Sequence, residues 1–123
     1  AHYYQDSLKD TTLTGIELTK KLLNLKTPPT AIICSLDKYF IGCLQECQER
    51  GLSTPKDISV VGYNDHDNYL SSQNLTFISH PLTKMGKMAV EILEKIEKGQ
   101  KPYKLSKLIE PILNKGKSDG KIN

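Results

Sequence analysis

The sequence predicts an α/β fold with a parallel sheet, on three observations. Apolar residues recur at helical spacing in three segments of the 123-residue chain. Short, almost wholly apolar runs lie between these segments, as expected for strands that helices cover on both faces. Helices and strands alternate with short connections, which favours parallel strands joined by right-handed crossovers.

The first helix is expected at 11–25, where leucines and an isoleucine recur on one side. Either Thr11 or Thr12 can cap its start. The proline pair at 28–29 ends it, because proline cannot continue a helix. The run TAIICS at 30–35 then predicts the first buried strand.

A second helix is expected at 38–50, with Asp37 as its cap and Gly51 closing it. The run ISVVGY at 58–63 has few polar residues and predicts a second, central strand. A polar loop follows at 64–74.

The last third of the chain predicts one more helix between two strands. LTFIS at 75–79 reads as the third strand, and a third helix is expected at 82–98. Its apolar stripe consists of Met85, Met88, Ala89, Ile92, Leu93 and Ile96. A weaker strand is expected at 107–114, where Pro111 favours a sheet edge.

Composition narrows the class of protein. Apolar residues make up 37% and charged residues 25%, and the net charge is +3. The longest apolar runs fall well short of the roughly 20 residues that a membrane helix needs, and the amino-terminal residues lack a signal-peptide pattern. We therefore expect no membrane partner. The lysine-rich stretch at 98–123 could contact nucleic acid, but a solvated surface is the favoured interpretation.

The three cysteines are Cys34, Cys43 and Cys47, and they cannot all pair within the chain. This count favours a reducing, cytoplasmic compartment. Cys43 and Cys47 are four apart on a predicted helix and could offer two thiolates to a metal. Buried thiols are the favoured interpretation, because no further cysteine or well-spaced histidine completes a site. We predict neither a metal nor a cofactor.

Two segments resemble, in order and in spacing, the core of LacI/GalR-type transcriptional regulators. In 29–65 the matching residues are Pro29, Thr30, Ala31, Ile32, Asp37, Gly42, Gly51, Pro55, Asp57, Ile58, Ser59, Val60, Val61, Gly62, Tyr63 and Asp65. In 75–93 they are Leu75, Thr76, Ile78, Pro81, Met85, Gly86, Ala89 and Leu93. Together the segments cover about two thirds of the chain. Each piece also fits an ordinary strand or helix, but that reading does not explain their joint spacing.

The resemblance implies a core of two α/β lobes, similar to periplasmic sugar-binding proteins, joined to a DNA-binding headpiece. This chain would then be a truncated, parallel-sheet C-terminal lobe at 1–79 and 103–123. The crossover helix at 80–102 would belong to an N-terminal lobe that the chain lacks, as it lacks the headpiece. Each large side chain left uncovered on that helix would cost roughly 1.5 to 3 kcal/mol. We therefore expect the helix to fold back or to be buried in another chain.

In the resembled family an effector lies between the lobes and is held at two strand ends, here Leu36 with Asp37 and Asn64 with Asp65. The family usually has Asn and Asp at the positions of Leu36 and Asn64. Leu36 has no hydrogen-bonding side chain and Asn64 has no charge, which favours a ligand less polar than a sugar, or a different one. Asp37 could instead cap its helix, and Asp65 could shape its loop. His80 stands at the crossover, as a hinge, pocket or plain surface residue.

The resemblance also implies a homodimer that pairs two headpieces on a palindromic operator DNA. The expected interface includes Tyr39, Ile41 and Gln45 on the second helix, and Tyr69 within 67–70. The implied function is effector sensing and dimerisation in a transcriptional regulator, with repression favoured over activation.

Two other classes fit less well. A solute-binding protein of a sugar transport system shares the lobe architecture, but the three cysteines and the sequence GYND favour a regulator. An enzyme is not predicted, because the sequence has no Gly-rich phosphate loop and no Ser-His-Asp grouping. Its histidines are scattered along the chain.

Overall fold

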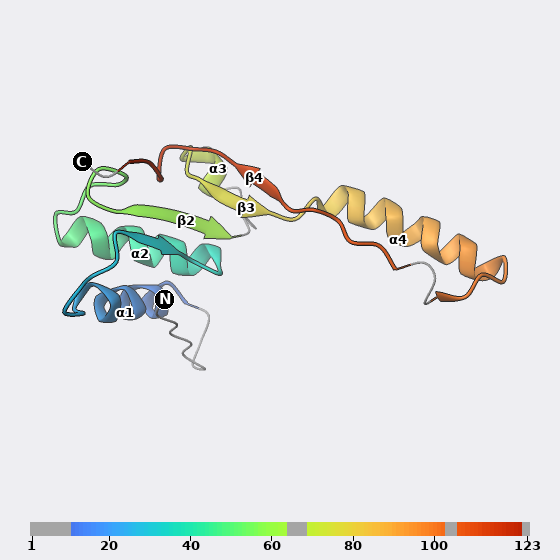
Figure 1. Ribbon diagram of the computed structural model, residues 1–123, viewed down its shortest axis with the longest axis horizontal. Helices are drawn as coiled ribbons and strands as arrows, with labels where there is room; N and C mark the ends of the chain where they lie inside the picture. Colours follow the sequence, from blue (N-terminus) through green and yellow to red (C-terminus); the bar gives the residue numbers. More distant parts are fainter. Residues whose placement is uncertain (1–10, 64–68, 103–105, 122–123) are drawn as a thin grey trace. The chain divides into compact units, whose positions relative to one another are not determined.

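The computed structural model describes residues 11–63, 69–102 and 106–121 (Figure 1). The element order is α1 (Thr12–Leu23), β1 (Ala31–Ile33), α2 (Asp37–Glu49), β2 (Ser59–Tyr63), α3 (Tyr69–Ser72), β3 (Phe77–Ser79), α4 (Leu82–Glu97) and β4 (Ile112–Asn114). The predicted α/β class is confirmed. The described residues divide into a first unit, within 1–79 and 113–123, and a second unit, 80–112.

The strands form a four-stranded sheet in the order β1-β2-β3-β4. β1 pairs with β2 in parallel, with Ile32 opposite Val60. β2 pairs with β3 in parallel, with Gly62 opposite Phe77. The parallel arrangement predicted for these three strands is therefore confirmed, and their carboxyl ends lie at one edge of the sheet.

The starts of the two N-terminal helices differ in their caps. Thr11 caps α1, and its Oγ1 accepts a hydrogen bond from the Thr14 N–H at 3.3 Å. The predicted cap of α2 is wrong. Leu36 holds that position with no side-chain hydrogen bond, and Asp37 is the first helical residue. Asp37 Oδ1 accepts from the Lys38 N–H at 2.8 Å, because a carboxylate in the first turn is stabilised by the N–H groups and dipole there.

α1 approaches α2 most closely at small residues, while the half-buried Leu22 and Leu23 pack against the core. The buried residues of α1 are Thr14, Gly15 and Thr19, whereas Leu13 is 70% exposed, against the expected apolar face. A Cβ atom at Gly15 would lie 2.6 Å from the Tyr39 carbonyl oxygen. The two backbones approach so closely that larger side chains are excluded from the contact.

The hydrophobic core of the first unit lies where α2 and α3 cover the sheet. Its side chains are Ile32, Cys34, Phe40, Cys43, Cys47, Ile58, Val60, Leu70 and Phe77. Leu70 comes from α3, a short helix in the segment expected to be a polar loop. Leu70 is fully buried, and this one apolar side chain fixes α3 on the core.

The chain's C-terminal segment, 115–121, is fastened to β2 and to the residues before β3; we call this segment the C-terminal clasp. Ser118 is buried, and its Oγ accepts from the Thr76 N–H at 2.9 Å and donates to the Val60 carbonyl at 2.7 Å. The Val60 N–H donates to the Ser118 carbonyl at 2.7 Å. Thr76 Oγ1 accepts from the Gly116 N–H at 2.8 Å. These bonds hold the clasp along the sheet.

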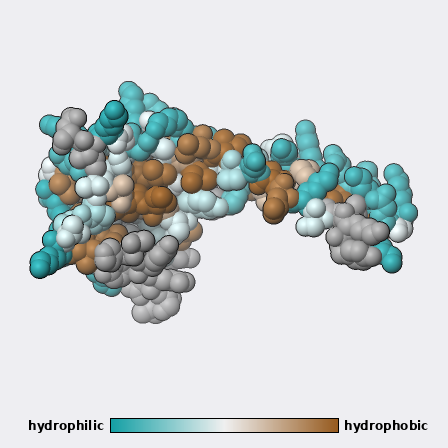
Figure 2. Space-filling view, viewed as in Figure 1, coloured by the Kyte–Doolittle hydropathy of each residue, from teal (hydrophilic) through white to brown (hydrophobic). Residues whose placement is uncertain are grey.

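The second unit consists of α4 and the described segments that follow it. α4 spans 82–97, close to the predicted 82–98, and none of its residues is buried. Leu82, Met85, Val90 and Leu93 are exposed, while Met88, Ile92 and Ile96 are half-buried. The apolar surface of α4 is visible in Figure 2. Its assignment to an N-terminal lobe stays a prediction.

Two further observations complete the fold. β4 is shorter than the strand expected at 107–114, since 106–111 form no regular element. Within the described ranges, no helix is long and apolar enough to cross a membrane.

Candidate functional site

The predicted effector residues begin at the carboxyl end of β1. β1 ends at Ile33 and β2 at Tyr63, and the Cys34 N–H donates to the Val61 carbonyl at 2.8 Å. The two strand ends are therefore neighbours. Leu36 and Asp37, both half-buried, form the turn from β1 into α2. In open α/β sheets this edge is where ligands gather.

The other half of the predicted strand-end site, Asn64 and Asp65, lies outside the described residues. They follow Tyr63 directly in the chain, at the end of β2. The structure thus places Leu36 and Asp37 at the end of one strand and Tyr63 at the end of its neighbour, and the role of all four predicted residues stays a prediction.

The described side chains at this edge include Leu36, Asp37 and Tyr63. Leu36 presents only carbon atoms, and one oxygen of Asp37 is bonded to the Lys38 N–H. Tyr63 is half-buried, and its ring adds apolar surface with one polar tip.

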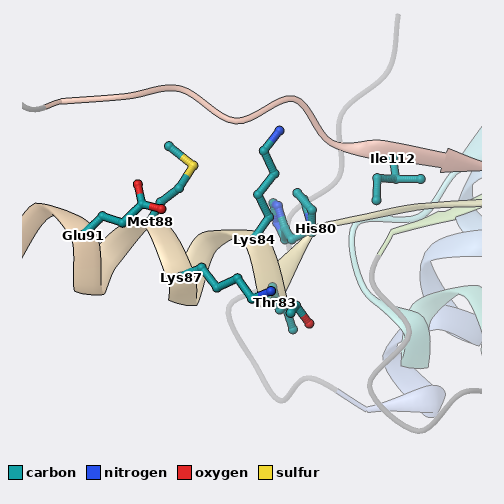
Figure 3. A pocket seen from close by; sticks show the side chains of 9 residues that line it. His80, Thr83, Lys84, Lys87, Met88, Glu91 and Ile112 are labelled. Atoms are coloured by element: carbon teal, nitrogen blue, oxygen red, sulfur yellow. The ribbon is translucent and has the colours of Figure 1, made fainter.

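His80 belongs to the second unit and lines a cavity of about 770 Å³ there. Figure 3 shows Lys84 and Met88 projecting from α4 toward the segment that carries Ile112. His80 is exposed, so it is both a surface residue and a lining residue of this cavity. Neither Leu36 nor Asp37 lines it.

Of the residues predicted for a dimer interface, Tyr39 lies on a different side of α2 from Ile41 and Gln45. Ile41 and Gln45 are four apart, so they lie on the same side of α2. Ile41 is half-buried, and the exposed Gln45 donates to Glu49 at 3.2 Å. Tyr39 lies elsewhere on the helix, where it packs against the core. Tyr69, on α3, is 41% exposed.

The three cysteines are free and buried, as predicted. A hydrogen bond with Cys34 and burial raise the pKa of Cys43 to about 12. A hydrogen bond with Cys43, together with burial, raises the pKa of Cys47 far above its ordinary value. Both thiols are protonated at neutral pH and are poor nucleophiles. The described residues contain no group of three side chains suited to a metal ion.

A charge network around the buried Glu46 carboxylate joins α1 and α2, and it was not predicted from the sequence. Glu46 is 2% exposed, and its Oε1 accepts from Arg50 Nε at 2.6 Å. Lys20 Nζ lies 3.6 Å from the other carboxylate oxygen. Arg50 Nη1 also donates to Asn24 Oδ1 at 2.9 Å. The spacing of Glu46 and Arg50 predicts a helical ion pair, but it does not show that the carboxylate is buried.

Comparison with known proteins extends these observations. Residues 2–118 match the family described as periplasmic binding protein-like domain. The HTH-type transcriptional repressor PurR of Glaesserella parasuis is 41% identical over 85 residues, which is 68% of this chain and 25% of that protein. The ribose operon repressor of Haemophilus influenzae is 35% identical over 100 residues, which is 79% of this chain and 30% of that protein.

A solved structure agrees with the sequence comparison. The dimeric Lac repressor with an 11-residue C-terminal deletion has a TM-score of 0.76 and 28% identity, over 92% of this chain and 42% of that one. The chain spans only a quarter to a third of the two curated relatives. The chain belongs to the family of periplasmic binding protein-like domains, and its sequence and fold are those of a LacI/GalR-type regulator core.

Proposed function

We propose that this chain is the effector-sensing and dimerisation part of a LacI-type transcriptional repressor. The observation that carries the proposal is its 35–41% identity to two transcriptional repressors over two thirds or more of its length. These relatives favour a repressor over the solute-binding protein of a sugar transport system. They are regulators and not enzymes, which supports a non-catalytic role, and the proposed location is the cytoplasm.

The proposed mechanism is linkage between two binding events. A small molecule binds between two lobes, at the edge formed by Leu36, Asp37, Asn64 and Asp65, and closes the core. Closure changes the spacing of DNA-binding headpieces outside this chain, and so changes operator affinity. In this proposal His80 lies at the crossover between the lobes, and α4 belongs to the N-terminal lobe.

Leu36 and Asn64 stand where the family usually has Asn and Asp, which favours an effector less polar than a free sugar. The ribose operon repressor, as its name states, acts on a sugar operon, so a sugar-related effector is the competing possibility.

A gel-shift comparison tests the proposal. We expect a protein that joins this chain to its upstream lobe and headpiece to bind a specific operator, with an affinity that an effector changes. The 123-residue chain alone should bind neither that operator nor the effector tightly, because the proposal places the headpiece and half of the cleft elsewhere. Specific operator binding by the isolated chain, or turnover of a small metabolite, would overturn the proposal.

A further inference from the structure

A second cavity lies in the first unit, at the amino ends of β1 and β2. It has a volume of about 360 Å³, within the range of small-molecule sites. Its lining residues are Leu23, Pro28, Pro29, Thr30, Arg50, Leu52, Asp57 and Ile58. Thr30 and Ile58 directly precede β1 and β2. The cavity is therefore at the opposite end of these strands from the candidate effector edge.

Most of the lining is apolar, and the exceptions include one side chain of each charge. Leu23 and Leu52 are half-buried and pack against the core, so they form a fixed apolar surface. Arg50 supplies a guanidinium group and Asp57 a carboxylate. An apolar cavity with a few orienting polar groups is the usual composition of a ligand site.

Arg50 is held in place by the network that joins α1 and α2. Its Nε donates to Glu46 and its Nη1 to Asn24. A guanidinium has five N–H donors, so three remain for which the described residues supply no acceptor. Glu46 is 2% exposed, so the guanidinium is bonded to a buried carboxylate. An arginine fixed in this way can bind a carboxylate with little loss of side-chain entropy.

Asp57 is also oriented with one oxygen to spare. Its Oδ2 accepts from the Ser53 N–H at 2.8 Å, which fixes the carboxylate in the loop before β2. No described residue donates to Oδ1. The network of Lys20, Arg50 and Glu46 has a net charge of +1, since two cations pair with one carboxylate. Asp57 supplies one negative charge elsewhere on the cavity wall. The cavity thus has complementary groups for a ligand that carries both charges.

We propose that this cavity binds a small zwitterionic molecule with an apolar side chain, of the aliphatic α-amino acid class. Its carboxylate bonds to the spare N–H groups of Arg50, and its ammonium group bonds to Asp57 Oδ1. Its side chain lies on Leu23 and Leu52. A carboxylic acid without the ammonium group would leave Asp57 unpaired and add a like charge beside it, so it binds more weakly. This site is independent of the proposed effector site.

Titration with L-leucine, followed by ¹⁵N–¹H NMR spectroscopy of the 123-residue chain, tests the proposal. We expect saturable shifts at the amides of Leu23, Thr30, Leu52 and Asp57, with none at Leu36 or Tyr63. N-acetyl-L-leucine lacks the ammonium group and L-leucinamide lacks the carboxylate. Each should bind about tenfold more weakly, since each loses one charge-assisted bond.

Three variants separate a binding effect from a folding effect. Asp57→Asn retains an acceptor for the Ser53 N–H but loses the charge, and should weaken L-leucine binding about tenfold. Arg50→Lys keeps the ion pair with Glu46 but loses the fork that a carboxylate needs, and should have a similar effect. Lys56→Gln, an exposed change outside the cavity, should bind like the wild type.

A thermal melt of each variant checks that it is folded. The proposal fails if L-leucine causes no saturable shifts at the cavity, or if its shifts occur at the strand edge instead. It also fails if folded Asp57→Asn binds L-leucine as well as the wild type does.

Discussion

At Gly42 the backbones of α1 and α2 meet, so a single added methyl group cannot be accommodated. A Cβ atom there would lie 2.8 Å from the Ile16 nitrogen, which belongs to a helix backbone and cannot rotate away. We expect Gly42→Ala to lower the free energy of unfolding by about 1–3 kcal/mol, as overpacked cores do. Urea unfolding followed by circular dichroism measures this change.

Gly86→Ala is the matched control for Gly42→Ala. Gly86 is also in a helix interior, but nothing lies within 4 Å of a Cβ atom placed there. Alanine should leave stability unchanged or raise it by about 0.5–1 kcal/mol, because it restricts the unfolded chain more than glycine does. If both variants lost the same stability, the helix contact would not be the cause.

Ser118 is the central residue of the C-terminal clasp. Ser118→Ala would leave a buried N–H of Thr76 and one acceptor site on the Val60 carbonyl unpaired. An unpaired buried group costs about 1–3 kcal/mol, which is the expected loss in urea unfolding. Ser72→Ala removes an exposed hydroxyl bonded to the Tyr69 carbonyl and should cost much less. An equal loss in the two variants would contradict a special role for the clasp.

The Cys43 thiol makes stability depend on pH in the alkaline range. Its pKa is raised from 9.0 to about 12 in the folded protein, so the folded state retains the proton when the unfolded state loses it. The stabilisation is complete below pH 9 and is lost between pH 9 and 12, at up to about 1.4 kcal/mol per pH unit. Urea unfolding in a reducing buffer should show a steeper alkaline loss for the wild type than for Cys43→Ala. Parallel pH profiles would contradict this expectation.

At the scale of elements, the sequence predicted the helices and strands that apolar periodicity marks and that proline or glycine ends. The long apolar stripe of α4 predicted its bounds to within a residue, and the run at β2 predicted a central parallel strand. The prediction that β1 is buried on both faces is wrong, because β1 lies at the edge of the sheet and its Ala31 and Ile33 are exposed. The sequence did not predict α3, because a single buried leucine in a polar segment gives no repeating apolar pattern. Nor did it predict the buried face of α1, since the backbone contact at Gly15 and Gly42 comes from tertiary packing.

The exposure of α4 predicts weak protection of its backbone. No α4 side chain is buried, and helix stability in water depends mainly on packing of an apolar face. In hydrogen exchange on the 123-residue chain, the amides of α4 should exchange faster than those of α2 and β2, which lie at the core. Protection of α4 that rises with protein concentration would instead show that another copy of the chain covers it.

At the scale of the whole molecule, the sequence predicted the family, which the comparisons show, and a candidate site at the strand edge, which stays a prediction. Leu36 and Asp37 could be predicted because they directly follow a predicted strand and match the spacing of the family motif, and both are local features of the sequence. The amino-end cavity was not predicted, because its walls come from four separate segments. Arg50 and Asp57 have ordinary local explanations, an ion pair and a turn, and only the fold places both of them on one cavity.

The proposed homodimer gives a prediction for the assembled protein. Ile41 is half-buried on the side of α2 that also carries the exposed Gln45, so Ile41→Asp would place a charge at the proposed interface. We expect at least tenfold weaker self-association in sedimentation velocity, because a desolvated charge without a partner is costly. Leu108→Asp makes the same chemical change at a fully exposed residue outside this interface and should associate like the wild type. Circular dichroism would verify that both variants are folded, and equal association of folded Ile41→Asp would remove Ile41 from the interface.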